Sequence, residues 1–236
     1  LASDERFAMC STFKLPLAGA ILAEIEAGRL ALAQSAESGR ADVLSYPPVV
    51  ARNVERGRLP LEQLCAAIVE VSDNSAANLL LRLIGGPEGL TAFVRRCGDT
   101  VTRLDRFEEA LNTNLPGDPR DTTTPAAMLA LMRTLLAGDV LAPESRRRLT
   151  GWMENASTGR DRLRAGLPPD WRAGDKTGTG ANGANNDVAI AVPPGRPPVF
   201  IASYISGGEA SDAHCKAIHA EAARRTAAFF AAAHLA

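Results

Sequence analysis

The sequence predicts an α+β fold, in which a helix-rich first part precedes an antiparallel sheet and a closing helix. Apolar residues recur with helical spacing through about the first 160 residues, and several of these runs end at glycines. Three strand-like runs separated by Gly, Asn and Pro follow Pro169. An alanine-rich run then fills the C-terminal end, and no internal repeat or low-complexity linker divides the chain.

The expected helices differ in how sharply the sequence marks their ends. Gly28 closes the first helix, and Pro60 directly precedes the second. Thr124 and Pro125 supply an N-cap and a first-turn proline for the fifth. In chain order, we expect helices over 11–28, 61–70, 75–86, 87–98, 124–138 and 142–155.

Residues 103–121 form a polar segment with no sustained period, and we expect a long loop there. A loop of this length inside a compact domain is often functional. After it, the runs within 170–180, 186–195 and 198–208 predict three strands of a meander. The final helix, from Ser211 or Asp212, closes the fold.

Composition limits the possible partners. The chain has 236 residues, 46% of them hydrophobic, which is enough to bury one or two cores. The formal net charge is −1, so we expect no nucleic-acid partner and no anionic membrane surface. No run reaches the roughly 18–20 apolar residues of a membrane-spanning helix. The chain starts at Leu1 without a signal peptide, and we expect that one was removed or that the sequence starts further downstream.

Cysteine and histidine usage argues against a metal or redox centre. The four cysteines form no C-x-x-C pair, and we expect small buried apolar side chains at Cys10, Cys65, Cys97 and Cys215. All three histidines lie near the C-terminus, where we expect His214 and His219 on the surface of the last helix, as we do His234. We therefore expect no metal and no cofactor, and a serine nucleophile here must find a base other than imidazole.

Ser11 and Lys14 stand three residues apart at the start of the first helix, so both side chains should lie on one face. A lysine whose pKa is lowered by burial can serve as the base for a serine nucleophile. The helix N-terminus would also favour negative charge that develops at Ser11. The alternative is a capping serine beside a solvated lysine.

Two further motifs complete a possible site. Ser72, Asp73 and Asn74 lie between two helices, where they form either an ordinary capped turn or a second hydroxyl and an amide beside Ser11. Lys176, Thr177 and Gly178 lie on the first predicted strand, which is either a plain edge strand or one whose glycine lets a substrate approach its backbone.

The three motifs in this order resemble those of class A β-lactamases and penicillin-binding proteins. The long loop favours the first family, because Arg106, Glu108 and Asn112 match its omega-loop signature R-x-E-x-x-L-N. Asp121 matches the aspartate that pairs with the arginine and closes the loop. The resemblance spans the chain and implies a β-lactamase/transpeptidase-like fold: an all-helical subdomain (11–158, with omega loop 103–121) and an antiparallel sheet flanked by helices (1–10 and 159–236).

The resemblance implies the hydrolysis of β-lactam antibiotics through an acyl-serine intermediate, and thus antibiotic resistance. Ser11 would attack the lactam carbonyl, and either Lys14 or Glu108 through a water would take its proton. Ser72, assisted by Lys176, would protonate the leaving nitrogen. By family position, Asn112 and Glu108 would hold the hydrolytic water, and Asn74 would bind the acylamide side chain. The backbone N–H groups of Ser11 and Thr179 would stabilise the oxyanion.

The substrate carboxylate needs cationic and hydroxyl partners, which Lys176, Thr177 and Thr179 can supply. Some relatives carry an arginine where Asn185 stands here, and others carry it in a T-G-x-x-R segment, which predicts Arg162 in that role. Tyr46 resembles the aromatic wall of the site, or it packs on the neighbouring prolines. Glu109 matches no family role, and we expect it to be structural.

Two departures from the family stand out. The family's two disulfides would need cysteines where Ala18 and Gly180 stand here, so we expect neither to form. Family members also begin with a helix and two strands before the nucleophile, and we expect this sequence to be a partial record of a secreted precursor.

We expect the full-length precursor to give a monomer in the periplasm or outside the cell, with small β-lactams as its partners. The competing functions are a penicillin-binding protein or D-alanyl-D-alanine peptidase, and a non-hydrolytic β-lactam sensor or inactive remnant. Glu108 in the omega-loop signature argues against the peptidase.

Overall fold

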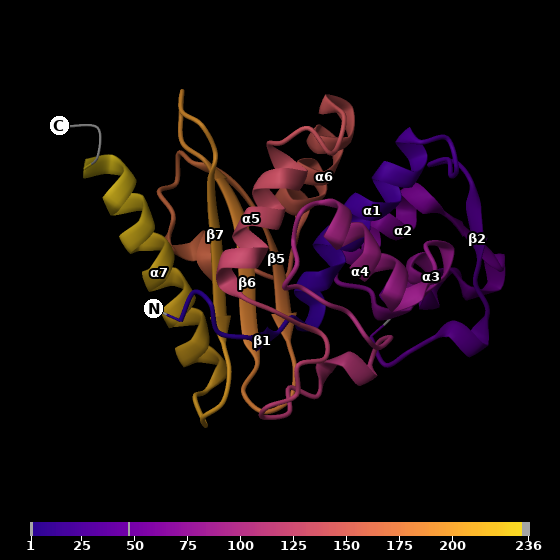
Figure 1. Ribbon diagram of the computed structural model, residues 1–236, viewed down its shortest axis with the longest axis horizontal. Helices are drawn as coiled ribbons and strands as arrows, with labels where there is room; N and C mark the ends of the chain where they lie inside the picture. Colours follow the sequence, from indigo (N-terminus) through magenta and orange to yellow (C-terminus); the bar gives the residue numbers. More distant parts are fainter. Residues whose placement is uncertain (1, 47, 233–236) are drawn as a thin grey trace.

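Helices enclose a three-stranded antiparallel sheet on both faces (Figure 1). The computed structural model describes residues 2–46 and 48–232. The sheet has the order β5 (Arg172–Thr179), β6 (Asn185–Val192) and β7 (Val199–Ile205). The helices are α1 (Lys14–Glu26), α2 (Leu61–Glu70), α3 (Asn74–Leu83), α4 (Gly86–Arg96), α5 (Pro125–Leu136), α6 (Pro143–Asn155) and α7 (Asp212–Ala232). The predicted α+β class is confirmed.

The local signals in the sequence mark the helix ends correctly. Helix α2 begins directly after Pro60, and the Thr124 hydroxyl accepts from Ala127 N at 3.1 Å to cap α5. The first helix differs from the prediction, because a 3₁₀ turn, η1 (Cys10–Phe13), precedes α1. Cys10 has a φ of 45°, so the chain bends sharply just before Ser11 and presents it from the turn.

Two pairs of short strands were not predicted. Strand β1 (Phe7–Ala8) pairs with β4 (Thr122–Thr123), and β2 (Ser35–Glu37) pairs with β3 (Arg58–Pro60). The first pair joins the segment before the nucleophile to the end of the long loop. It therefore fixes the loop's exit against η1.

The two faces of the sheet contribute to different cores. On β6, Val188 and Ile190 point into the large cluster formed by α1–α6, whereas Ala189 points the other way. Ala189 packs with Leu163 and with residues of α7, which flanks the sheet on the side away from α1–α4 (Figure 1). Both faces are therefore buried, in agreement with the almost continuous apolar run of β6.

The prediction for the histidines is wrong for His219. His214 is exposed, but His219 is completely buried, with Nδ1 2.8 Å from Ser203 Oγ and Nε2 3.2 Å from Asn185 Oδ1. The two residues are five apart on α7, so they lie on different faces, and the inner face packs on β6 and β7. Burial and the nearby Arg162 charge lower the pKa of His219 to about 4. His234 lies outside the described residues.

The four cysteines are free in the described chain; Cys97 is half-buried, and the other three are buried. Burial raises the pKa of the Cys10 thiol to about 12, so this side chain behaves as a small apolar group. None of the described helices combines the length and the apolar character needed to cross a bilayer.

Candidate active site

Ser11 and Lys14 meet as their spacing predicts. Ser11 lies in η1 and is half-buried, and Lys14 Nζ is 3.0 Å from its Oγ. Strand β5 runs directly past this turn: a Cβ on Gly178 would lie 2.6 Å from Met9 O and 3.2 Å from Ser11 N. Only glycine fits there, so strand β5 can lie directly against the turn that carries Ser11. The sequence predicted that this glycine makes room for a substrate, and the space is instead taken by the turn itself.

The Lys14 ammonium is enclosed by oxygen atoms from three segments. Its Nζ lies 2.9 Å from Ser72 O, 2.5 Å from Asn74 Oδ1 and 2.9 Å from Glu108 Oε1. The side chains of Lys14 and Glu108 are fully buried. Burial lowers the pKa of Lys14, and Glu108 opposes that shift. A lysine in this setting can lose its proton more easily than one in water, which suits a base beside a hydroxyl.

Ser72 connects the two lysines of the site. It has a φ of 60° between α2 and α3, and Lys176 Nζ donates to its Oγ at 3.0 Å. The adjacent Asp73 holds this turn, because its carboxylate accepts from Ala76 N at 2.8 Å and from Val49 N at 2.8 Å. Burial, followed by the repulsion from Lys14, lowers the pKa of Lys176 to about 7. Ser72 therefore has a proton donor of near-neutral pKa beside it.

The omega loop is closed by an ion pair at its base. Asp121 is fully buried, and it accepts from Asp105 N at 2.7 Å, Arg106 N at 2.9 Å and Arg106 Nε at 2.5 Å. The sequence predicted this pairing of Arg106 with Asp121. The contact joins the two ends of the loop and orients the segment that carries Glu108.

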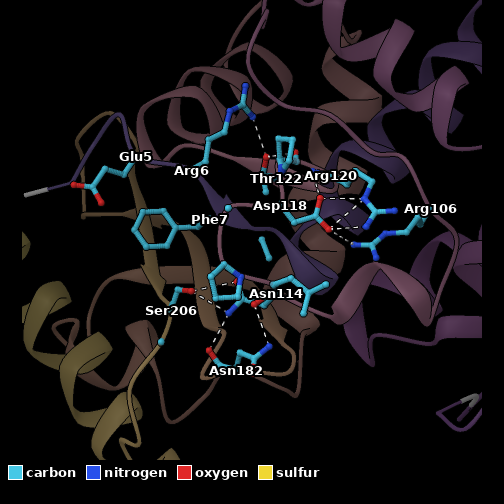
Figure 2. A pocket seen from close by; sticks show the side chains of 16 residues that line it. Glu5, Arg6, Phe7, Arg106, Asn114, Asp118, Arg120, Thr122, Asn182 and Ser206 are labelled. Atoms are coloured by element: carbon cyan, nitrogen blue, oxygen red, sulfur yellow. Dashed lines mark hydrogen bonds and ion pairs between the residues drawn. The ribbon is translucent and has the colours of Figure 1, made fainter.

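Farther along, the loop is tied to the sheet by amide side chains. Figure 2 shows Asn114 between Ser206 and Asn182, and its Nδ2 donates to Ser206 Oγ and to Asn182 O, each at 2.9 Å. Behind the loop lies a hollow of about 480 Å³, lined in part by Phe7, Asn114 and Asp118 (Figure 2). Neither Ser11 nor the lysines line it, so this hollow is separate from the candidate site.

Glu108 is positioned by two asparagines, of which the sequence predicted one. Asn112 Nδ2 donates to Glu108 Oε2 at 2.7 Å. Asn78, on α3, accepts from Glu108 N and donates to Glu108 O, both at 2.9 Å. Sequence reasoning missed Asn78, and the only available signal was an asparagine among apolar residues of a predicted helix. The Asn78 side chain therefore satisfies both backbone polar groups of Glu108.

Arg162 contacts the ends of β5 and β6 that lie nearest to the turn between these strands. It is buried, and its guanidinium donates to Thr179 Oγ1 at 2.9 Å and to Asn186 O at 2.7 Å. Thr177 Oγ1 donates to Thr158 Oγ1 at 2.8 Å, on the side of the strand away from Lys176. The Arg162 guanidinium is therefore in contact with the hydroxyl of Thr179, a residue exposed at the end of β5.

Tyr46 is 49% exposed, so its ring is free to contact a ligand. Its carbonyl accepts from Asn74 N at 3.0 Å, which fixes this loop beside the second motif. Gly180 faces the buried thiol of Cys10: a Cβ there would lie 2.6 Å from Sγ. No group of three or more His, Cys, Asp or Glu residues in the described chain is arranged to hold a metal.

The comparisons with known proteins agree with this geometry. The family model described as "Beta-lactamase enzyme family" matches residues 1–230. Beta-lactamase AST-1 of Nocardia asteroides is 48% identical over 94% of this chain and 71% of its own. Beta-lactamase CTX-M-8 of Citrobacter amalonaticus is 44% identical over 88% of this chain and 71% of its own.

Solved structures of class A β-lactamases are also similar to this chain. An ancestral class A β-lactamase of Gram-negative bacteria superposes with a TM-score of 0.95 at 49% identity, covering 97% of this chain and 88% of its own. The putative class A β-lactamase PenP from Rhodopseudomonas palustris superposes with a TM-score of 0.95 at 44% identity, covering 97% of this chain and 87% of its own.

Proposed function

Because this chain belongs to the β-lactamase enzyme family, we propose that it is a class A serine β-lactamase that hydrolyses penicillins and cephalosporins and so confers antibiotic resistance. The observation that carries the proposal is the buried ammonium of Lys14, which contacts Ser11, Ser72 and Glu108 at once. A nucleophile, its base and a second carboxylate meet there without a histidine.

Acylation begins when Ser11 Oγ forms a bond to the lactam carbonyl carbon. Its proton passes to Lys14, whose Nζ lies 3.0 Å from Ser11 Oγ, or through a water to Glu108, which contacts the same ammonium at 2.9 Å. The backbone N–H groups of Ser11 and Thr179 stabilise the oxyanion. The carbon–nitrogen bond of the ring then breaks, and Ser72 gives the nitrogen a proton that Lys176 replaces.

Deacylation depends on the omega loop. Glu108 and Asn112 hold a water between them, and the Glu108 carboxylate takes a proton from it as the water attacks the acyl carbonyl. The ester bond to Ser11 breaks, and the serine regains its proton. The product is the ring-opened acid. This second half of the cycle separates a hydrolase from a protein that is only acylated.

The substrate lies along β5. Its carboxylate meets Arg162, Thr177, Thr179 and Lys176. Gly178 allows β5 to lie directly beside the turn of Ser11, so the strand and the nucleophile face the same substrate. At the other end, Asn74 binds the acylamide and Tyr46 covers it.

The same proposal includes the setting of the enzyme. The chain acts as a monomer without metal or cofactor, in the periplasm or outside the cell. It consists of a helical subdomain (11–158) and a sheet subdomain (1–10 and 159–236), with the site where the two meet.

The test is turnover of a chromogenic cephalosporin by the parent and by Glu108→Ala. We expect rapid multiple turnover in the parent and a single burst in the variant, because the variant acylates but lacks the deacylation base. A single burst in both proteins would instead indicate a penicillin-binding protein or a sensor. No reaction in either would contradict the proposal.

A further inference from the structure

A second carboxylate, Glu109, lies at the rim of the site and has no part in the mechanism above. It is exposed and adjacent in sequence to Glu108, yet its Oε1 lies 3.4 Å from Asn74 Nδ2. The Ser45 hydroxyl donates to the same oxygen. Glu109 therefore sits in the corner formed by the omega loop, Asn74 and the Tyr46 loop.

No cation neutralises this carboxylate. Among the ion pairs of residues 2–46 and 48–232, none includes Glu109, and its two hydrogen-bond partners there are neutral. The cations assigned to the substrate carboxylate, Arg162 and Lys176, belong to the opposite end of the site, around β5. The Lys14 ammonium on the other side of Asn74 is paired with Glu108, so the negative charge of Glu109 has no cationic partner of its own among the described residues.

The position of Asn74 indicates which part of a bound substrate would lie near Glu109. The Asn74 Nδ2 that would donate to the carbonyl oxygen of the acylamide lies 3.4 Å from Glu109 Oε1, so a group on the carbon next to that carbonyl would come near the Glu109 carboxylate. A charged group on this α carbon would be only two bonds from the amide. An ammonium there would gain attraction from Glu109, and a carboxylate there would meet repulsion.

We propose that Glu109 is a specificity-determining residue that favours β-lactams with an ammonium group on the α carbon of the acyl side chain and disfavours those with a carboxylate there. The inference rests on the proposed function, since it concerns the substrate of the same site. It assigns a role to a residue that matches none in the omega-loop signature.

The expected effect is moderate because Glu109 is exposed. Solvent-exposed charge pairs typically change an equilibrium by about two- to fivefold. Attraction of an ammonium and repulsion of a carboxylate act in opposite directions, so the preference between the two substrates should be about tenfold. Because the site is open to salt, the preference should shrink as ionic strength rises.

Three penicillins form a matched series for the test: benzylpenicillin, its α-amino analogue ampicillin, and its α-carboxy analogue carbenicillin. We would measure kcat/KM for each at about pH 6, below the ordinary α-amino pKa of about 7.7–8.0. The variant is Glu109→Gln, which keeps an oxygen for Ser45 and Asn74. The control is Glu144→Gln, which removes the same charge from the exposed start of α6.

We expect the ratio of ampicillin to carbenicillin kcat/KM to fall about tenfold in Glu109→Gln and to stay within twofold of the parent in Glu144→Gln. Unchanged ratios in Glu109→Gln would overturn the inference while leaving the hydrolase intact. Failure of the parent to turn over benzylpenicillin would instead overturn the proposed function.

A second measurement needs no variant. In the parent, the same ratio should decline severalfold between about 0.05 and 0.5 M salt, since the Debye length shortens from above 10 Å to below 8 Å. The carboxylate common to all three penicillins cancels from the ratio. A ratio that does not respond to salt would also overturn the inference.

Discussion

Asp121→Asn tests whether the base of the omega loop holds the catalytic carboxylate in place. Asp121 Oδ1 accepts from the backbone N–H groups of Asp105 and Arg106, and Oδ2 accepts from Arg106 Nε. The amide oxygen of asparagine can keep the first two bonds. Its NH₂ group would then face the Nε–H of the Arg106 guanidinium, so one charge-assisted bond is lost and two donors oppose each other.

The magnitude follows from that single bond. A hydrogen bond to a charged group contributes about 1.5–3 kcal/mol. For a protein of this size, each kcal/mol corresponds to roughly 2–4 °C in Tm, so we expect Asp121→Asn to lower Tm by about 3–12 °C. Because Glu108 is part of the same loop, deacylation should slow more than acylation, and acyl-enzyme should accumulate during turnover.

The assay combines thermal unfolding at neutral pH with the burst amplitude on a chromogenic cephalosporin. Asp118→Asn is the matched control, because Asp118 pairs mainly with the exposed Arg120 on the same loop. It should shift Tm less and leave no burst. Equal shifts in the two variants, or normal deacylation in Asp121→Asn, would refute the reasoning.

Two further predictions concern residues that the sequence did not reveal. Asn78→Ala should destabilise the fold by about 2–6 kcal/mol in urea unfolding, because it leaves the buried N–H and C=O of Glu108 without partners. The variant should also slow deacylation at least tenfold, and normal deacylation would contradict this expectation. His219 has a folded-state pKa of about 4 against an ordinary 6.5, so the unfolded chain binds the proton first as pH falls. The free energy of unfolding should therefore fall by up to about 3 kcal/mol between pH 6.5 and 4, and the stability gap between the parent and His219→Gln should narrow over that window; a constant gap would contradict it.

The sequence predicts the long elements well because their signals are local. A proline before Leu61, a capping threonine at 124 and the glycine after α1 each mark a helix end by the backbone conformation that residue favours. The three strands of the sheet are separated by turn residues in the same way. Strands of two or three residues, such as β1 and β2, contain no period to detect, so neither was predicted.

Much of the candidate site could also be predicted, because the spacing of the motif residues along the chain indicates which side chains meet. Ser11 and Lys14 share one helical turn, and Arg106 and Asp121 bracket one loop, so a contact follows from each pair. Asn78 and His219 could not be found in this way. Their roles depend on which element packs against them: the omega loop against α3, and β6 and β7 against α7. Those contacts are decided by the whole fold.

The proposed proton path depends on Lys176, whose pKa of about 7 reflects burial and the repulsion from Lys14. Without substrate, this lysine is therefore poised between its two protonation states near neutral pH. A substrate carboxylate beside β5 brings an opposite charge, which raises the pKa of an ammonium. Binding would then load Lys176 with the proton that Ser72 passes to the lactam nitrogen. The same carboxylate that anchors the antibiotic would thereby promote the opening of its ring.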